Sequence, residues 1–151
     1  MGLLKRRREL DDADFQCLAL AIRRARAVHP FFLTAWVFLP DPWHAIWAPQ
    51  YPLTISEVMK SIKNSSTILI NRGRATSGEL WQGRFFDCAL RTVKEYREKV
   101  KYIHLNPVKA GLVGRVQDWR WSSVNEYSGM GAAEQMRRCG LTTDRVSLPL
   151  D

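Results

Sequence analysis

Apolar positions recur in two different rhythms along the first third of the chain. Between residues 15 and 25 they return every three or four positions, as on one face of a helix, and Asp11 can cap its first turn. Residues 31–39 are apolar on both alternating faces, which predicts a strand covered on two sides. Residues 43–49 alternate around a second strand, and the turn residues between the two strands favour an antiparallel pair.

Capping-box motifs predict two further helices. Residues 54–57 open an apolar stripe that stops near Gly73, and residues 92–95 open another. The second helix is expected to break before Pro107, because the residue preceding a proline is pushed out of the helical region. Between the two helices, the pattern of residues 80–90 indicates a strand.

The order helix, strand, strand, helix, strand, helix predicts an α+β fold with helices packed on an antiparallel sheet. A ferredoxin-like arrangement would begin with a strand, but only Leu3 and Leu4 are available before the first helix, so this strand is missing or very short. We expect residues 1–10 to be a basic leader, residues 11–128 to form one domain and residues 129–151 to be a flexible tail.

The charge balance favours an anionic partner. Twenty-three lysines and arginines against fifteen acidic residues give a net charge of +8, and nucleic acid is the first candidate. The longest apolar stretch, residues 31–39, is far shorter than the roughly 20 residues that span a bilayer. Because no secretory signal precedes the first helix, we expect a cytoplasmic protein with no membrane partner.

Tyr102 and Asn106 are the first candidates for chemistry. They stand four residues apart on the third expected helix, on a different face from its apolar stripe, so a phenol and an amide can share one site. The alternative is that Tyr102 lies along the surface and Asn106 caps the next turn. His44, on a strand beside a turn, is either a structural residue or a metal ligand.

Basic residues surround these elements and alternate with aromatic side chains, a mixture suited to phosphate contacts and base stacking on single strands or hairpin ends. The candidate nucleic-acid-binding residues are Arg72, Arg74, Arg84, Arg91, Lys94, Lys101, Lys109 and Trp81. The alternative is that the aromatic residues belong to the core and the cations only keep the surface soluble.

Four segments of the chain resemble a known family. They read LPDPWHAIWAP at 39–49, LWQGRFFDCALR at 80–91, YIHLNPVKAGLV at 102–113 and WRWSS at 119–123. In this order they are similar to the REP-associated tyrosine transposases, a branch of the HUH single-strand DNA transposases. The similarity runs from about residue 31 to residue 127, and the segment that begins at Tyr102 is the most specific.

The resemblance implies a protein that binds hairpin-forming single-stranded DNA, as a monomer or homodimer, and cuts and rejoins it during DNA transposition. Tyr102 matches the family's nucleophile, which forms a 5′-phosphotyrosine link. His44 and Asn106 match ligands of a divalent cation, Mg²⁺ or Mn²⁺, that polarises the scissile phosphate.

The chain departs from the family pattern at two positions. Pro42 stands where the family has the first of two histidines that flank a bulky residue, and Cys88 stands where a histidine is usual. The cation would lose a ligand, so two hypotheses follow: a strand-cleaving transposase, or a catalytically inactive DNA-binding remnant of one. A basic RNA-binding module is a third hypothesis, supported only by charge and aromatic content.

Overall fold

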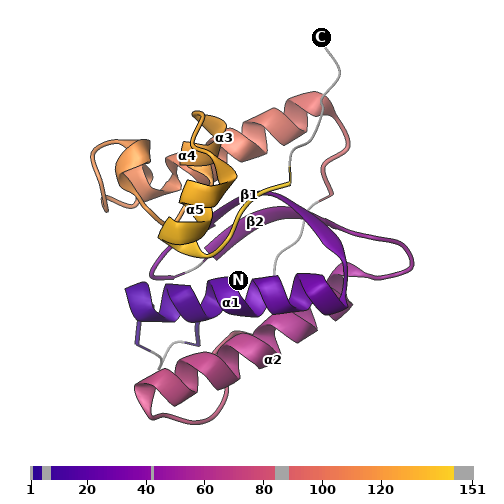
Figure 1. Ribbon diagram of the computed structural model, residues 1–151, viewed down its shortest axis with the longest axis vertical. Coiled ribbons are helices and arrows are strands. Elements are labelled where there is room, and N and C mark those ends of the chain that lie inside the picture. Colours follow the sequence, from indigo (N-terminus) through magenta and orange to yellow (C-terminus); the bar gives the residue numbers. More distant parts are fainter. Residues whose placement is uncertain (1, 5–7, 42, 84–88, 145–151) are drawn as a thin grey trace.

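Two antiparallel strands lie between helices in the computed structural model of the protein (Figure 1). Strands β1 (Phe31–Phe38) and β2 (Trp43–Pro49) form the sheet. Helices α1 (Asp12–Val28) and α2 (Ile55–Arg74) lie side by side on one face, and α3 (Val93–Lys109) lies on the other. This is the α+β arrangement that the order of elements predicts. The structure describes residues 2–4, 8–41, 43–83 and 89–144.

Three short helical segments follow α3. They are η1 (Val116–Asp118), α4 (Val124–Tyr127) and α5 (Ala132–Cys139). The longest helix of the described residues is α2, with 20 residues. Within the described ranges, no helix combines the length and the apolar character needed to cross a membrane.

Helix starts follow the sequence motifs. Both α1 and α2 begin with complete capping boxes, each of which satisfies two backbone donors and stabilises its helix by about 1 kcal/mol. At α3 the Thr92 side chain accepts the Glu95 N–H at 3.0 Å. The Glu95 carboxylate accepts the Arg91 N–H at 2.7 Å.

The two faces of β1 are buried against different helices. A bulge interrupts its pairing with β2 between Leu33 and Ala35. Leu33 therefore lies on the same face as Trp36 and Phe38, in the core that includes α1, and not on the face that strict alternation predicts. Ala35 belongs to a second cluster with Ile103 of α3. Burial on both faces confirms the predicted covered strand.

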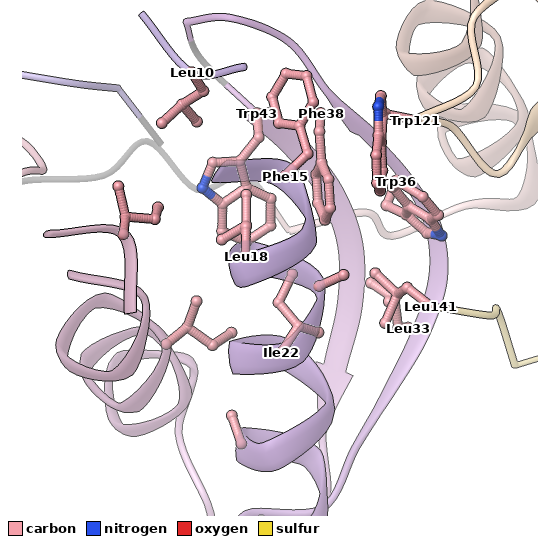
Figure 2. Packing of buried hydrophobic residues seen from close by; sticks show 14 of the residues in the cluster. Leu10, Phe15, Leu18, Ile22, Leu33, Trp36, Phe38, Trp43, Trp121 and Leu141 are labelled. Carbon is pink, nitrogen blue, oxygen red and sulfur yellow. The ribbon is translucent and has the colours of Figure 1, made fainter. Parts of the chain in front are cut away.

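The larger core lies between α1 and the sheet. Figure 2 shows Phe15 and Leu18 of α1 beside Phe38, Trp43 and Trp121, all of which are buried. The ring of Phe15 lies 6.0 Å from that of Phe38 and 5.5 Å from that of Trp121, measured between centroids. Each side chain buried in this way stabilises the fold by about 1.5–3 kcal/mol.

The expected first strand is reduced to a few residues. Leu3 forms an isolated antiparallel bridge with Trp81, and the Asp41 carboxylate accepts the Leu3 N–H at 2.9 Å. This contact ties the segment to Asp41, which follows the end of β1. The strand expected at 80–90 is likewise limited, in its described part, to the bridge at Trp81.

Helix α3 does not break before Pro107, so that prediction is wrong. Pro107 lies inside the helix and is buried one turn after the buried Ile103. An interior proline costs about 3 kcal/mol, which the burial of these two side chains offsets. The Asn106 carbonyl accepts the Ala110 N–H at 2.8 Å, and the chain then turns at Gly111, where φ is +73°.

The segment after residue 128 is packed and not a free tail in its described part. It contains α5, and Cys139 and Leu141 are buried in the larger core. The Asp144 N–H donates to the Leu33 carbonyl at 2.7 Å, so this segment is hydrogen-bonded to β1. The expectation of a tail is wrong for residues 129–144. Helix α5 buries only Gln135 and Cys139, so the sequence shows no apolar stripe there. Residues 145–151 lie outside the described residues.

Candidate active site

Tyr102 lies on a face of α3 that combines solvent access with a contact to the sheet. The next two residues, Ile103 and His104, are buried, so helical geometry turns Tyr102 away from the core. Its side chain is 42% exposed. The ring meets that of His44 on β2 edge-on, with the centroids 5.9 Å apart. An accessible phenol therefore lies beside an imidazole.

His44 is a half-buried residue on the side of β2 that faces α3. Burial, with a smaller contribution from nearby positive charge that includes Lys99, lowers the pKa of His44 to about 4. The imidazole is therefore neutral near pH 7 and carries a nitrogen lone pair that can accept a hydrogen bond.

Asn106 does not cap a new turn, because α3 continues past it to Lys109. Its side-chain Nδ2 is buried and makes no hydrogen bond with any residue in the described ranges. A buried donor without a partner costs about 1–3 kcal/mol, so the amide of Asn106 has the capacity to donate one more hydrogen bond.

Two lysines converge on Tyr102. The Nζ atom of Lys99 lies 4.5 Å from the ring centroid, and that of Lys109 lies 5.6 Å from it. With Asn106 these residues form one stripe, because they follow one another at intervals of three and four positions. A surface pocket of about 600 Å³ opens beside the stripe and is lined in part by Arg91, Lys99 and Tyr102.

The expected nucleic-acid-binding residues divide between two regions. One exposed group lies on α3 or just before it and comprises Arg91, Lys94, Lys101 and Lys109. Arg72 lies on the opposite side of the sheet, where it lines a pocket of about 630 Å³ together with residues of α1 and α2. Arg84 lies outside the described residues.

Two of the expected nucleic-acid-binding residues are buried. The Arg74 side chain is 6% exposed and pairs with Asp14, with 2.6 Å between Nη2 and Oδ2. Trp81 is 4% exposed, and its indole N–H donates to Ser66 Oγ at 2.9 Å. Arg74 therefore joins α2 to α1 and Trp81 belongs to the core, so neither is an exposed contact for a phosphate or a base.

Comparisons with known proteins identify the family. No family model matches the chain. A REP-associated tyrosine transposase of Escherichia coli (strain K12) is 36% identical over 132 residues, which cover 87% of this chain and 77% of that protein. The chain belongs to the REP-associated tyrosine transposase family.

Two other proteins agree with this assignment. A Haemophilus influenzae protein provisionally assigned to the same family is 30% identical over 107 residues, covering 64% of this chain and 61% of that protein. A solved REP-associated tyrosine transposase, bound to a REP hairpin, matches with a TM-score of 0.72 and 35% identity. That match covers 83% of this chain and 73% of the solved chain.

Few of the side chains described around Tyr102 in this REP-associated tyrosine transposase could ligate the divalent cation that the sequence resemblance implies. Among the described residues, no three His, Cys, Asp or Glu side chains gather closely enough to hold a metal ion. His44 and two lysine ammonium groups lie against the phenol ring. The carboxylates of Glu95 and Glu98 line the pocket beside it, whereas Mg²⁺ and Mn²⁺ prefer several oxygen ligands held together. Pro42 and Cys88 lie outside the described residues.

A buried polar network, which the sequence reasoning missed, holds α3 on β1. A ring nitrogen of His104 lies 2.7 Å from Ser123 Oγ, which also accepts the Trp36 N–H at 3.0 Å. The Tyr127 hydroxyl donates to the Thr34 carbonyl, and its ring lies edge-on to His104 with 4.7 Å between centroids. The sequence holds one hint of this network. The segments YIHLNP and WRWSS both belong to the family resemblance, and they supply His104 and Ser123.

Proposed function

We propose that this protein binds single-stranded DNA next to a hairpin, and cleaves and rejoins one strand through Tyr102. Membership of the REP-associated tyrosine transposase family supports this function, as does a solved member that is bound to a REP hairpin. The observation that carries the proposal is the exposed phenol of Tyr102, held edge-on against His44. A DNA substrate also favours the cytoplasmic location expected from the sequence.

In the proposed step the Tyr102 oxygen attacks the phosphorus of the scissile phosphodiester. A bond forms between the phenolic oxygen and phosphorus as the bond between phosphorus and the 3′ oxygen breaks. The proton lost by the phenol is balanced by the proton gained by the 3′ oxygen. The products are a 5′-phosphotyrosine link and a free 3′ hydroxyl, and attack by that hydroxyl reverses the step without ATP or water.

The neighbouring residues have distinct roles in this proposal. Neutral His44 orients the phenol, because its ring restricts the position of Tyr102 from the β2 side. The unpartnered amide of Asn106 donates a hydrogen bond to a phosphate oxygen. The exposed cations on and before α3 contact phosphates on either side of the scissile one.

The second candidate is a DNA-binding remnant that no longer cleaves. It is favoured by the side chains near Tyr102 in the described ranges, where no three His, Cys, Asp or Glu residues gather closely enough to hold a metal ion. A labelled hairpin with single-stranded flanks separates the two functions. A covalent protein–DNA adduct that disappears in Tyr102→Phe supports cleavage, whereas hairpin binding without an adduct supports the remnant. A preference for the matching RNA strand would favour the RNA-binding alternative instead.

A further inference from the structure

We propose that Lys99 and Lys109 hold the scissile phosphate over Tyr102 and supply the positive charge that a divalent cation would otherwise provide. This inference rests on the proposed strand cleavage, and it assigns a phosphate-binding role to two side chains of α3. It predicts that the protein forms its DNA adduct without a divalent metal ion.

The positions of the two ammonium groups are the first argument. Lys99 and Lys109 are ten residues apart, which separates their backbones by about 15 Å along the helix axis. Their Nζ atoms nevertheless lie 4.5 Å and 5.6 Å from the same ring centroid. Both side chains therefore bend along the helix toward Tyr102, one from each end.

The type of group at the site is the second argument. Two ammonium groups and the Asn106 Nδ2 are all hydrogen-bond donors, and a phosphate offers acceptors only. Neither Lys99 nor Lys109 forms an ion pair with a carboxylate in the described part of the chain. Two like charges at one aromatic ring repel each other, and a bound phosphate between them relieves that repulsion.

The same charges oppose a metal ion at this position. A divalent cation beside Tyr102 would be repelled by both ammonium groups. Although Glu95 and Glu98 line the same pocket, no three His, Cys, Asp or Glu side chains of the described residues gather closely enough to hold such an ion. The charge that stabilises a phosphoryl-transfer transition state can come from lysine as well as from a metal ion. The residues of this stripe therefore favour lysine, and not a metal ion, as the source of the charge that stabilises the transition state.

The test uses the full chain and a hairpin oligonucleotide with single-stranded flanks. Adduct formation is measured in EDTA and in Mn²⁺ for the wild type, Lys99→Met, Lys109→Met and Lys60→Met. Lys60 is an exposed lysine of α2 on the opposite side of the sheet, so its variant controls for the change in net charge. Lys99→Arg tests whether charge is sufficient.

We expect equal adduct formation in EDTA and Mn²⁺, a loss of roughly tenfold to hundredfold in Lys99→Met and Lys109→Met, and no change in Lys60→Met. Lys99→Arg should recover most of the rate. An adduct that requires Mn²⁺ and is insensitive to both lysines would overturn this inference while leaving cleavage by Tyr102 intact.

A binding measurement decides the case in which no adduct forms under any condition. In the Tyr102→Phe background, affinity for the oligonucleotide is measured against salt concentration. Each lysine that contacts a phosphate should contribute about 0.7 to the slope of log affinity against log salt for a single strand. Slopes that fall in both lysine variants but not in Lys60→Met support the phosphate site, and unchanged slopes overturn it.

Discussion

The ring of Tyr102 on α3 meets the ring of His44 on β2 edge-on, with centroids 5.9 Å apart. Edge-on aromatic pairs are worth about 0.5–1.5 kcal/mol beyond the area that they bury. The contact thus fixes one side of an otherwise exposed phenol. It also links two of the four segments of the sequence that resemble the REP-associated tyrosine transposases.

Removal of this contact should slow cleavage without preventing DNA binding. In His44→Ala, Tyr102 gains rotational freedom, and we expect the rate of adduct formation to fall about tenfold or more while hairpin affinity changes less than twofold. Single-turnover adduct formation and equilibrium binding of the same oligonucleotide measure the two quantities. An unaltered rate would show that His44 does not position the phenol.

The buried pair between Arg74 and Asp14 should contribute to stability and not to DNA binding. Arg74→Met leaves the Asp14 carboxylate buried without its partner, which we expect to cost about 3–5 kcal/mol of unfolding free energy in urea. The double variant Arg74→Met, Asp14→Leu should regain much of that loss. If Arg74→Met is stable and weakens DNA binding instead, Arg74 belongs to the DNA interface.

Much of the fold follows from the sequence because its signals are local. The N-cap at Asp11 marked the start of α1, and the capping box at residues 54–57 marked the start of α2. Which face of β2 meets α3 was not predicted, and the structure places His44 on that face. The break expected at Pro107 failed because a local steric rule competes with burial of the proline in the folded chain. The bulge after Leu33 depends on pairing with β2, which no local pattern encodes.

The site was predictable only in part, for a similar reason. Spacing along one helix predicts that Tyr102 and Asn106 share a face, and it places Lys99 on the same face. The proximity of the Lys99 ammonium group to the Tyr102 ring appears only in the structure. Charge alone could not separate Arg74, which is committed to Asp14, from Arg91, which is exposed. Only the three-dimensional structure shows that the Arg74 side chain is buried and that Arg91 is exposed.

The packing of α5 predicts the reactivity of a cysteine. Burial raises the pKa of the Cys139 thiol to about 11, and its side chain lies in the larger core. A raised pKa keeps the thiol protonated at pH 8, so alkylation should require unfolding and should accelerate only as the pH approaches 11. Mass spectrometry of iodoacetamide-treated protein checks this. Labelling in native buffer as fast as in urea would show that this segment is detached.

The DNA surface should lie on the side of the sheet that carries α3. Arg91 is exposed and lines the pocket beside Tyr102. We expect Arg91→Gln to lower the salt dependence of single-strand binding by about 0.7 in slope, and Lys60→Met on the opposite side to leave it unchanged. Equal slopes for wild type and Arg91→Gln would remove Arg91 from the interface.

The most direct measurement maps the covalent bond. The protein is incubated with the hairpin oligonucleotide, digested and analysed by mass spectrometry for a nucleotide attached to a tyrosine. We predict one modified residue, Tyr102, and no modified peptide from Tyr102→Phe. Attachment at Tyr96 or Tyr127, or an adduct that persists in Tyr102→Phe, would contradict the assignment of Tyr102 as the nucleophile.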